Sequence, residues 1–256
     1  MITSAQNSKL KLARSLMGRP KERQAAGAFV AEGVRLVEEA LAAGWPFRTV
    51  LYTSALRARG LELVRKLEAQ GCEVEQVSEE LLNAISETET SQGLLAILEC
   101  APLPLPQRLD FVLIPDSLRD PGNLGTLLRT AAAAGVQAVL LPPETADAFA
   151  PKVLRAGMGA HFHLPIHALG WEEIRTATRS LTVTLADMRG RPCWETDLGR
   201  PLALIIGGEA EGASAEARRL ADESISIPMP GRAESLNAGV AGAILLFEVV
   251  RQRQAG

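Results

Sequence analysis

The chain has 256 residues, of which 47% are hydrophobic and 22% are charged, and its formal net charge is −3. This is the composition of a folded globular protein and argues against a disordered tail protein. The negative net charge argues against a protein that holds nucleic acid through its overall electrostatic field, and the length allows one large domain or two smaller ones.

A basic segment near the start is the first feature along the chain. It runs from Lys9 to Arg23 and contains six basic residues and a single acidic one, Glu22. Such a cluster suits a polyanion such as RNA, although it can also be the solvated face of a helix. The candidate RNA-binding residues are Lys9, Lys11, Arg14, Arg19, Lys21 and Arg23.

Strand-like and helix-like patterns alternate through the first hundred residues. The strand-like runs cover 29–30, 49–52, 73–77 and 94–98, and the helix-like runs cover 34–43, 57–70 and 79–85. The alternation predicts a small α/β domain over residues 1–100. The next segment, 101–109, has prolines at three of nine positions and can sustain neither a helix nor a central strand. We interpret it as an interdomain linker.

The remainder, 110–256, has the pattern of a second α/β domain. Strand-like runs are separated by helical stretches, which predicts a parallel sheet covered on both faces. In open sheets of this kind ligands bind beyond the carboxyl ends of the strands, so the turns there are the first candidates for a site. The runs begin at Phe111, Val136, His161, Leu181, Leu202 and Ser224.

The first turn of interest covers residues 116–129, DSLRDPGNLGTLLR. Pro121 and Gly122 favour a bend, and we expect a helix to begin near Leu124 with Asn123 as its cap. Arg129 follows six residues later, where its guanidinium can bind a phosphate through two hydrogen bonds. The alternative for Arg129 is a surface salt bridge.

The second turn covers residues 207–214, GGEAEGAS, after a strand-like run. Its spacing is close to that of a phosphate-binding loop, but Ala213 stands at the lysine position, and Glu209 and Glu211 would repel a triphosphate. The sequence therefore excludes an NTPase, and the dinucleotide fingerprint fails as well. Glycines at this turn can still bring the backbone close to a flat, less charged ligand.

The third turn covers residues 227–237, IPMPGRAESLN. Its prolines stiffen the chain, and Ser235 and Asn237 place short polar side chains near the start of the last helix. The alternative is that both are simply helix caps. The following helix is rich in alanine and glycine, so we expect it to pack closely against another element or a partner subunit.

Metal, membrane and secretion signals are not predicted. The histidines at 161, 163 and 167 have no accompanying cysteine or paired carboxylates, and packing or surface roles are the expectation. The longest apolar run, 238–250, is shorter than the roughly 20 residues that cross a bilayer, and the N-terminus has no apolar core like that of a signal peptide. Three scattered cysteines suit a reducing compartment, so we expect a cytoplasmic protein without a membrane or metal partner.

The three turns, in this order, resemble motifs 1, 2 and 3 of the SpoU (TrmH) family of RNA ribose 2'-O-methyltransferases, of the SPOUT class. The first hundred residues, with FVAEGVRLVEEAL and SQGLLAI, resemble the L30e-like substrate-binding domain often fused before it. The motif residues are Asn123, Gly125, Arg129, Thr130 and Ala131; Gly207, Gly208, Glu209 and Gly212; and Ile227, Pro228, Met229, Gly231, Glu234, Ser235, Leu236 and Asn237.

The resemblance implies a SPOUT-type parallel α/β sheet with a C-terminal deep trefoil knot, preceded by a small L30e-like α/β domain. It also implies a homodimer that uses the knotted region, and S-adenosylmethionine as cofactor. One departure from the family is Gly157, where many relatives carry a serine. The domains are then an RNA substrate-binding domain (1–100), a linker (101–109) and a catalytic domain (110–256).

The implied reaction moves a methyl group from S-adenosylmethionine to a ribose 2'-hydroxyl, with 23S ribosomal RNA as the expected substrate. The alternatives are a tRNA 2'-O-methyltransferase, a non-catalytic RNA-binding ribosome-assembly factor, and a knotted base methyltransferase. We expect Arg129 to bind the phosphate beside the target ribose, because a guanidinium is effectively never deprotonated in proteins. By position, the catalytic residues are Asn123, Arg129, Glu209, Ser235 and Asn237, and the cofactor-binding residues are Gly207, Ile227, Met229 and Leu236.

Overall fold

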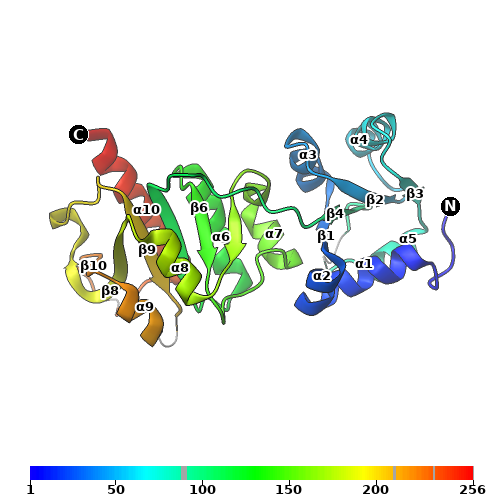
Figure 1. The fold of residues 1–256 in the computed structure, drawn as a ribbon. Coiled ribbons are helices and arrows are strands. Elements are labelled where there is room, and N and C mark those ends of the chain that lie inside the picture. Colours follow the sequence, from blue (N-terminus) through cyan, green and yellow to red (C-terminus); the bar gives the residue numbers. More distant parts are fainter. Residues whose placement is uncertain (88–90, 210–211, 233, 256) are drawn as a thin grey trace. The chain divides into compact units, whose positions relative to one another are not determined.

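The computed structural model describes residues 1–87, 91–209, 212–232 and 234–255 (Figure 1). The chain divides into two units. Unit 1 comprises Met1–Ala101 and Phe149–Phe162, and unit 2 comprises Pro102–Ala148 and His163–Gly256.

Unit 1 is built on a four-stranded sheet of order β1-β4-β2-β3. Strand β4 is antiparallel to β1 and β2, whereas β2 and β3 are parallel. The strands and helices predicted for the first hundred residues are confirmed. The strands are β1 (Ala28–Glu32), β2 (Phe47–Tyr52), β3 (Val74–Gln76) and β4 (Leu94–Glu99); the helices are α1 (Ser8–Gly18), α2 (Pro20–Ala26), α3 (Val34–Ala42), α4 (Ala58–Ala69), α5 (Glu79–Asn83) and α7 (Pro151–Gly157), with the 3-10 turn η1 (Ala160–Phe162).

Segment 149–162 belongs to unit 1 although it lies far along the chain. The ring of Phe149 lies 4.8 Å from that of Phe29 on β1, and the ring of Phe162 lies 5.3 Å from that of Trp45, measured between centroids. Aromatic pairs at these distances bury large apolar areas. The second half of the chain therefore completes the core of unit 1.

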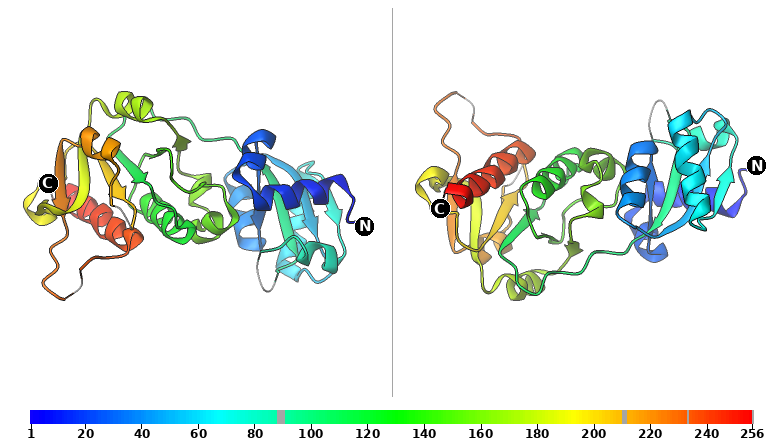
Figure 2. Two further views of the ribbon diagram at one scale, coloured as in Figure 1. Left: turned by 90° about the horizontal axis from the view of Figure 1, so that it is seen from below. Right: turned by 90° about the horizontal axis from the view of Figure 1, so that it is seen from above.

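Unit 2 contains a six-stranded sheet of order β10-β8-β9-β5-β6-β7 in which all neighbouring strands are parallel. This confirms the predicted parallel sheet. Helices α6 and α10 cover one face, and α8 and α9 cover the other (Figure 2). The strands are β5 (Phe111–Asp116), β6 (Ala138–Leu141), β7 (Ile166–Ala168), β8 (Thr182–Pro192), β9 (Leu202–Gly207) and β10 (Glu223–Ser226); the helices are α6 (Pro121–Ala133), α8 (Trp171–Thr178), α9 (Ala215–Leu220) and α10 (Ala238–Ala255), with the 3-10 turn η2 (Cys193–Glu195).

The strand predicted to begin at His161 is wrong. His161 is buried in η1, and β7 begins only at Ile166. Met158 ends α7 in the left-handed conformation (φ 49°) and Gly159 follows at φ 93°, which turns the chain before an extended segment can form. Pro165, which has no N–H to donate to a ladder, directly precedes the strand.

Helix α10 packs closely on α6, as its small residues predicted. A Cβ added to Gly242 would lie 2.4 Å from Leu127 Cδ1, and one added to Gly239 would lie 3.4 Å from the carbonyl oxygen of Asn123. Glycine at these positions lets the two helices approach. The opposite side of α10 exposes Val240 (47%) and Phe247 (49%), which lie on one face because they are two helical turns apart.

Within the described ranges, no helix combines the length and apolar character that a bilayer crossing requires. Among the same residues, no group of three or more His, Cys, Asp or Glu side chains is arranged to hold a metal ion.

Candidate active site

The first turn begins α6 three residues earlier than the sequence indicated. Pro121 occupies the first helical turn, and Asp120 is the N-cap because its Oδ1 accepts a hydrogen bond from the Asn123 N–H at 2.8 Å. The prediction that Asn123 caps this helix is therefore wrong. A capping side chain accepts a hydrogen bond from the backbone at the helix start. The side chain of Asn123 does not, and it can therefore bind other partners.

Those partners come from the second and third turns. Asn123 Nδ2 donates to Glu209 Oε1, and Asn123 Oδ1 accepts from Asn237 Nδ2 at 2.9 Å. A carboxylate only accepts hydrogen bonds, so Glu209 determines which way both amides face. The hydrogen-bonded chain Glu209–Asn123–Asn237 brings together three of the five candidate catalytic residues, from turns that follow β9, β5 and β10.

Asn237 serves two purposes at once. Its Oδ1 accepts from the Val240 N–H at 3.2 Å at the start of α10, while its Nδ2 donates to Asn123. The helix-cap interpretation is thus correct for Asn237 but incomplete. Because the cap requires the oxygen to face α10, the NH₂ group is held toward Asn123.

Neither Arg129 nor Ser235 joins the hydrogen-bonded chain Glu209–Asn123–Asn237 through a hydrogen bond between described residues. Arg129 lies on the exposed side of α6, about 9 Å along the helix axis from Asn123 for six residues of α-helix. Among the described residues it forms no ion pair, so the surface salt bridge considered for it is not observed. Ser235 is exposed. The catalytic roles of both residues stay predictions.

The second turn closes on itself through its backbone. The N–H and C=O groups of Gly208 and Gly212 bond reciprocally at 3.2 Å, and a Cβ on Gly207 would lie 2.6 Å from the Ala213 nitrogen. Only glycine fits at position 207, because the backbone at Ala213 lies too close for a side chain. Glu211 lies outside the described residues, and Glu209 is exposed at the point where the turn meets Asn123.

The third turn presents unpaired backbone. The described peptide groups from Ile227 to Leu236 make no backbone–backbone hydrogen bond. Ile227 and Met229 are half-buried, and Leu236 is 36% exposed. Free N–H and C=O groups beside apolar side chains are suited to a flat ring with polar edges, because the apolar faces cover the ring and the backbone satisfies its edge.

Asp116 is a further site residue that the sequence reasoning did not single out. It ends β5 with 1% exposure, and its Oδ2 accepts from the Ser214 N–H at 2.6 Å while its Oδ1 accepts from the Ser117 hydroxyl at 3.2 Å. A Cβ on Gly208 would lie 2.5 Å from the Ser117 carbonyl oxygen. Asp116 thus holds the second turn against the first. The available signal was a lone carboxylate ending the otherwise apolar run FVLIPD.

The basic segment of unit 1 is only partly available for RNA. Arg23 is 5% exposed and donates from Nη1 to the Leu16 carbonyl oxygen at 2.5 Å, so its assignment to an RNA-binding surface is corrected. Lys9 lies 2.8 Å from Glu73 and 2.7 Å from Glu75, and hydrogen bonds to these carboxylates raise its pKa. The residues that remain exposed are Lys11, Arg14, Arg19 and Lys21.

Comparisons with known proteins cover both units. The model of the SpoU rRNA Methylase family matches residues 110–247, and that of the MRM3-like substrate binding domain matches residues 7–96. The chain is 36% identical over 251 residues to the 23S rRNA (guanosine(2553)-2'-O)-methyltransferase RlmP of Bacillus subtilis, covering 97% of this chain and 98% of the relative. It is 32% identical over 270 residues to the 23S rRNA (uridine(2479)-2'-O)-methyltransferase of Streptomyces viridochromogenes, covering 100% and 93%.

Solved structures agree with these sequence matches. The SpoU methyltransferase AviRb of Streptomyces viridochromogenes, in complex with the cofactor AdoMet, superposes with a TM-score of 0.88 at 32% identity over 98% of this chain and 100% of that one. An AdoMet-bound rRNA methyltransferase of Sinorhizobium meliloti gives a TM-score of 0.86 at 34% identity, covering 98% and 97%. The mixed α/β fold with an N-terminal substrate-binding domain is thereby confirmed.

Asp116→Asn tests the connection between the first two turns. The amide keeps one oxygen for the Ser214 N–H and turns its NH₂ group to the Ser117 hydroxyl, so both hydrogen bonds lose the negative charge of the acceptor, at a cost of about 1–2 kcal/mol. We expect a melting temperature several degrees lower by differential scanning calorimetry. Asp120→Asn is the matched control, since asparagine caps a helix as well as aspartate does. Equal melting temperatures for wild type and Asp116→Asn would contradict the assignment.

Proposed function

This chain belongs to the SpoU rRNA methylase family, and from that premise we infer that it transfers a methyl group from S-adenosylmethionine to a ribose 2'-hydroxyl of 23S ribosomal RNA. The observation that carries the proposal is the hydrogen-bonded chain Glu209–Asn123–Asn237. It assembles polar side chains from three separate turns at the carboxyl edge of a parallel sheet, where ligands of such sheets bind.

The turns around the hydrogen-bonded chain Glu209–Asn123–Asn237 fit the methyl donor. Ile227, Met229 and Leu236 offer apolar side chains beside unpaired backbone groups, and the tight closure at Gly207 brings further backbone to the same edge. We propose that these residues hold the adenine and ribose of the donor. When bound, S-adenosylmethionine supplies an electrophilic methyl group on a sulfonium.

Residues of the protein itself then position the methyl acceptor, the ribose of the RNA. Transfer would require the ribose 2'-oxygen to lie in line with the sulfur–methyl bond, which would break with the thioether as the leaving group, and to give its proton to water. Asn123 and Asn237 each have a second amide hydrogen beyond those used in the hydrogen-bonded chain, and these donors can orient the ribose oxygens. Arg129 binds the adjacent phosphate through its planar fork of donors, so that alignment rather than the guanidinium as a base supplies much of the rate.

We propose that this site does not select the base. One relative acts on a guanosine and another on a uridine, although both are similar to this chain over nearly its whole length. A ribose hydroxyl is common to all nucleotides, whereas base edges differ. We therefore propose that the target nucleotide is selected by RNA contacts away from the ribose site, including contacts to unit 1, which the substrate-binding domain model matches.

We also propose a homodimer, a knotted C-terminal segment and a cytoplasmic location. A homodimer would cover the exposed side of α10, where Val240 and Phe247 lie beside the half-buried Ile244, because an apolar face of a helix is stable when another surface buries it. The family likeness supports a deep trefoil knot in the C-terminal segment. The scattered cysteines support a cytoplasmic location.

The test of the reaction compares wild type with Asn237→Asp on unmodified 23S rRNA transcripts and labelled S-adenosylmethionine, followed by digestion to nucleosides. Label on the ribose is expected. Asn237→Asp keeps an oxygen for the Val240 cap but loses the donor to Asn123, so kcat should fall about tenfold or more, equivalent to about 1.4 kcal/mol. Asn7→Asp, the same change at the cap of α1, should retain full activity. Label on a base would contradict ribose transfer, and no label would favour a non-catalytic scaffold.

Arg129→Lys tests the phosphate contact separately. Lysine keeps the charge but not the planar fork, so two parallel hydrogen bonds to one phosphate become impossible. We expect kcat/KM for rRNA to fall at least tenfold while the Kd for S-adenosylmethionine, measured by calorimetry, stays within twofold of wild type. Near-wild-type turnover would show that charge alone is sufficient.

Phe247→Asp tests the homodimer. A carboxylate on the apolar side of α10 would have to be desolvated in the dimer, so size-exclusion chromatography with light scattering should give the dimer mass for wild type and the monomer mass for the variant. Arg219→Asp, also exposed on unit 2, is the control for the introduced carboxylate and should remain dimeric. A monomeric wild type would rule the dimer out.

A further inference from the structure

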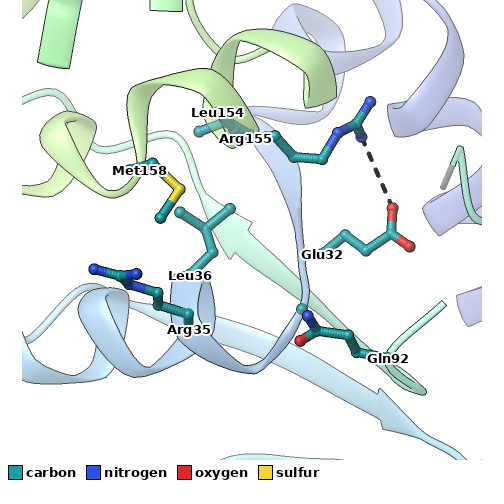
Figure 3. A pocket seen from close by; sticks show the side chains of 8 residues that line it. Glu32, Arg35, Leu36, Gln92, Leu154, Arg155 and Met158 are labelled. Atoms are coloured by element: carbon teal, nitrogen blue, oxygen red, sulfur yellow. Dashed lines mark ion pairs between the residues drawn. The ribbon is translucent and has the colours of Figure 1, made fainter. Parts of the chain in front are cut away.

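Unit 1 contains a pocket of about 290 Å³ between the start of α3 and helix α7 (Figure 3). Leu36, Leu154 and Met158 give it an apolar side, and Arg35, Gln92 and Arg155 place polar groups around it. Its volume corresponds to a single flat group with a small substituent and is far too small for a double helix. The pocket lies wholly within unit 1, whereas the turns of the candidate active site belong to unit 2.

The side chain of Gln92 is held in one orientation. Its Oε1 accepts the Val34 N–H at 3.0 Å, and so satisfies one of the free donors at the start of α3. The residue before Val34 is Gly33, at φ 95°, and a Cβ there would lie 3.2 Å from Gln92 Oε1. Because the amide oxygen is committed to the helix, the Nε2 group is left as a hydrogen-bond donor for a ligand.

The two arginines at the pocket differ in their surroundings. Arg155 Nη1 lies 3.9 Å from Glu32 Oε2 (Figure 3), and its Nη2 lies 3.4 Å from Glu87 Oε2. These ion pairs hold the Arg155 guanidinium against the pocket. Arg35 is exposed and, in the part of the chain that the structure describes, forms no ion pair. Its charge is therefore available to a ligand that carries negative charge.

We propose that this pocket binds one unstacked nucleotide of the RNA substrate. The base lies against Leu36 and Met158, Gln92 Nε2 donates to an acceptor on the base, and Arg35 contacts the phosphate. Proteins read RNA sequence mostly at unstacked bases, which they hold on apolar or guanidinium surfaces and recognise at their hydrogen-bonding edges. The inference rests on the proposed function for the identity of the ligand, and it supplies the base-reading contact that the ribose site lacks.

The test uses the full chain, unmodified 23S rRNA transcript as the probe, and two pocket variants. Gln92→Glu keeps an oxygen for the Val34 N–H but replaces the donor by an acceptor, and Met158→Trp fills the pocket. We expect each variant to raise both the Kd for the transcript, by filter binding, and the KM about tenfold. The kcat at saturating RNA and the Kd for S-adenosylmethionine should stay at wild-type values, because unit 2 is unchanged.

Arg35→Ala, with Arg65→Ala as its control, distinguishes a contact in the pocket from a general effect of positive charge on RNA binding. Both residues are exposed cations of unit 1, but only Arg35 lines the pocket, so only Arg35→Ala should weaken binding about tenfold. Wild-type Kd and KM for Gln92→Glu and Met158→Trp, both folded by circular dichroism, would overturn the pocket and leave the methyl transfer intact. A different outcome would overturn the proposed function and support the pocket: the wild type binds the transcript but shows no transferase activity, and the pocket variants lose that binding.

Discussion

The hydrogen-bonded chain Glu209–Asn123–Asn237 is the constraint on which the candidate active site depends. Its direction is fixed at both ends, by a carboxylate that can only accept and by a backbone N–H of α10 that can only donate. Each amide between them therefore has one allowed orientation. Partners that lie 86 and 114 residues apart along the chain thus become one rigid polar group, and rigid donors are what alignment of a ribose oxygen requires.

Close backbone approach makes that geometry possible. Gly207 and Gly208 let the second turn contact the first, Asp116 holds the two together from a buried position, and Gly242 lets α10 lie against α6. A side chain at any of these glycines would displace backbone or a core leucine rather than fill empty space. The family's glycine-rich motifs are accordingly packing requirements first, and the cofactor contacts proposed for them depend on that packing.

Unit 1 shows the same dependence between distant segments. Its apolar core includes Phe162, the half-buried Phe149 packs against Phe29 of that core, and its pocket includes residues of α7. All of these come from a segment that follows the first strands of unit 2. Two recognition tasks are thereby divided in our proposal: unit 2 binds the ribose, which every nucleotide shares, and unit 1 contacts features that differ between nucleotides. This division accounts for relatives that act on a guanosine and on a uridine.

The sequence by itself determined the alternation of strands and helices, the parallel sheet and the three turns, because periodicity, proline and glycine act on their immediate neighbours. It could not determine which side chains meet. Asp120 rather than Asn123 caps α6, Arg23 is buried, and the expected strand at His161 is a 3-10 turn. Such outcomes depend on contacts between residues far apart in the chain, whose competition for each hydrogen bond and each buried position is decided only when the tertiary structure packs.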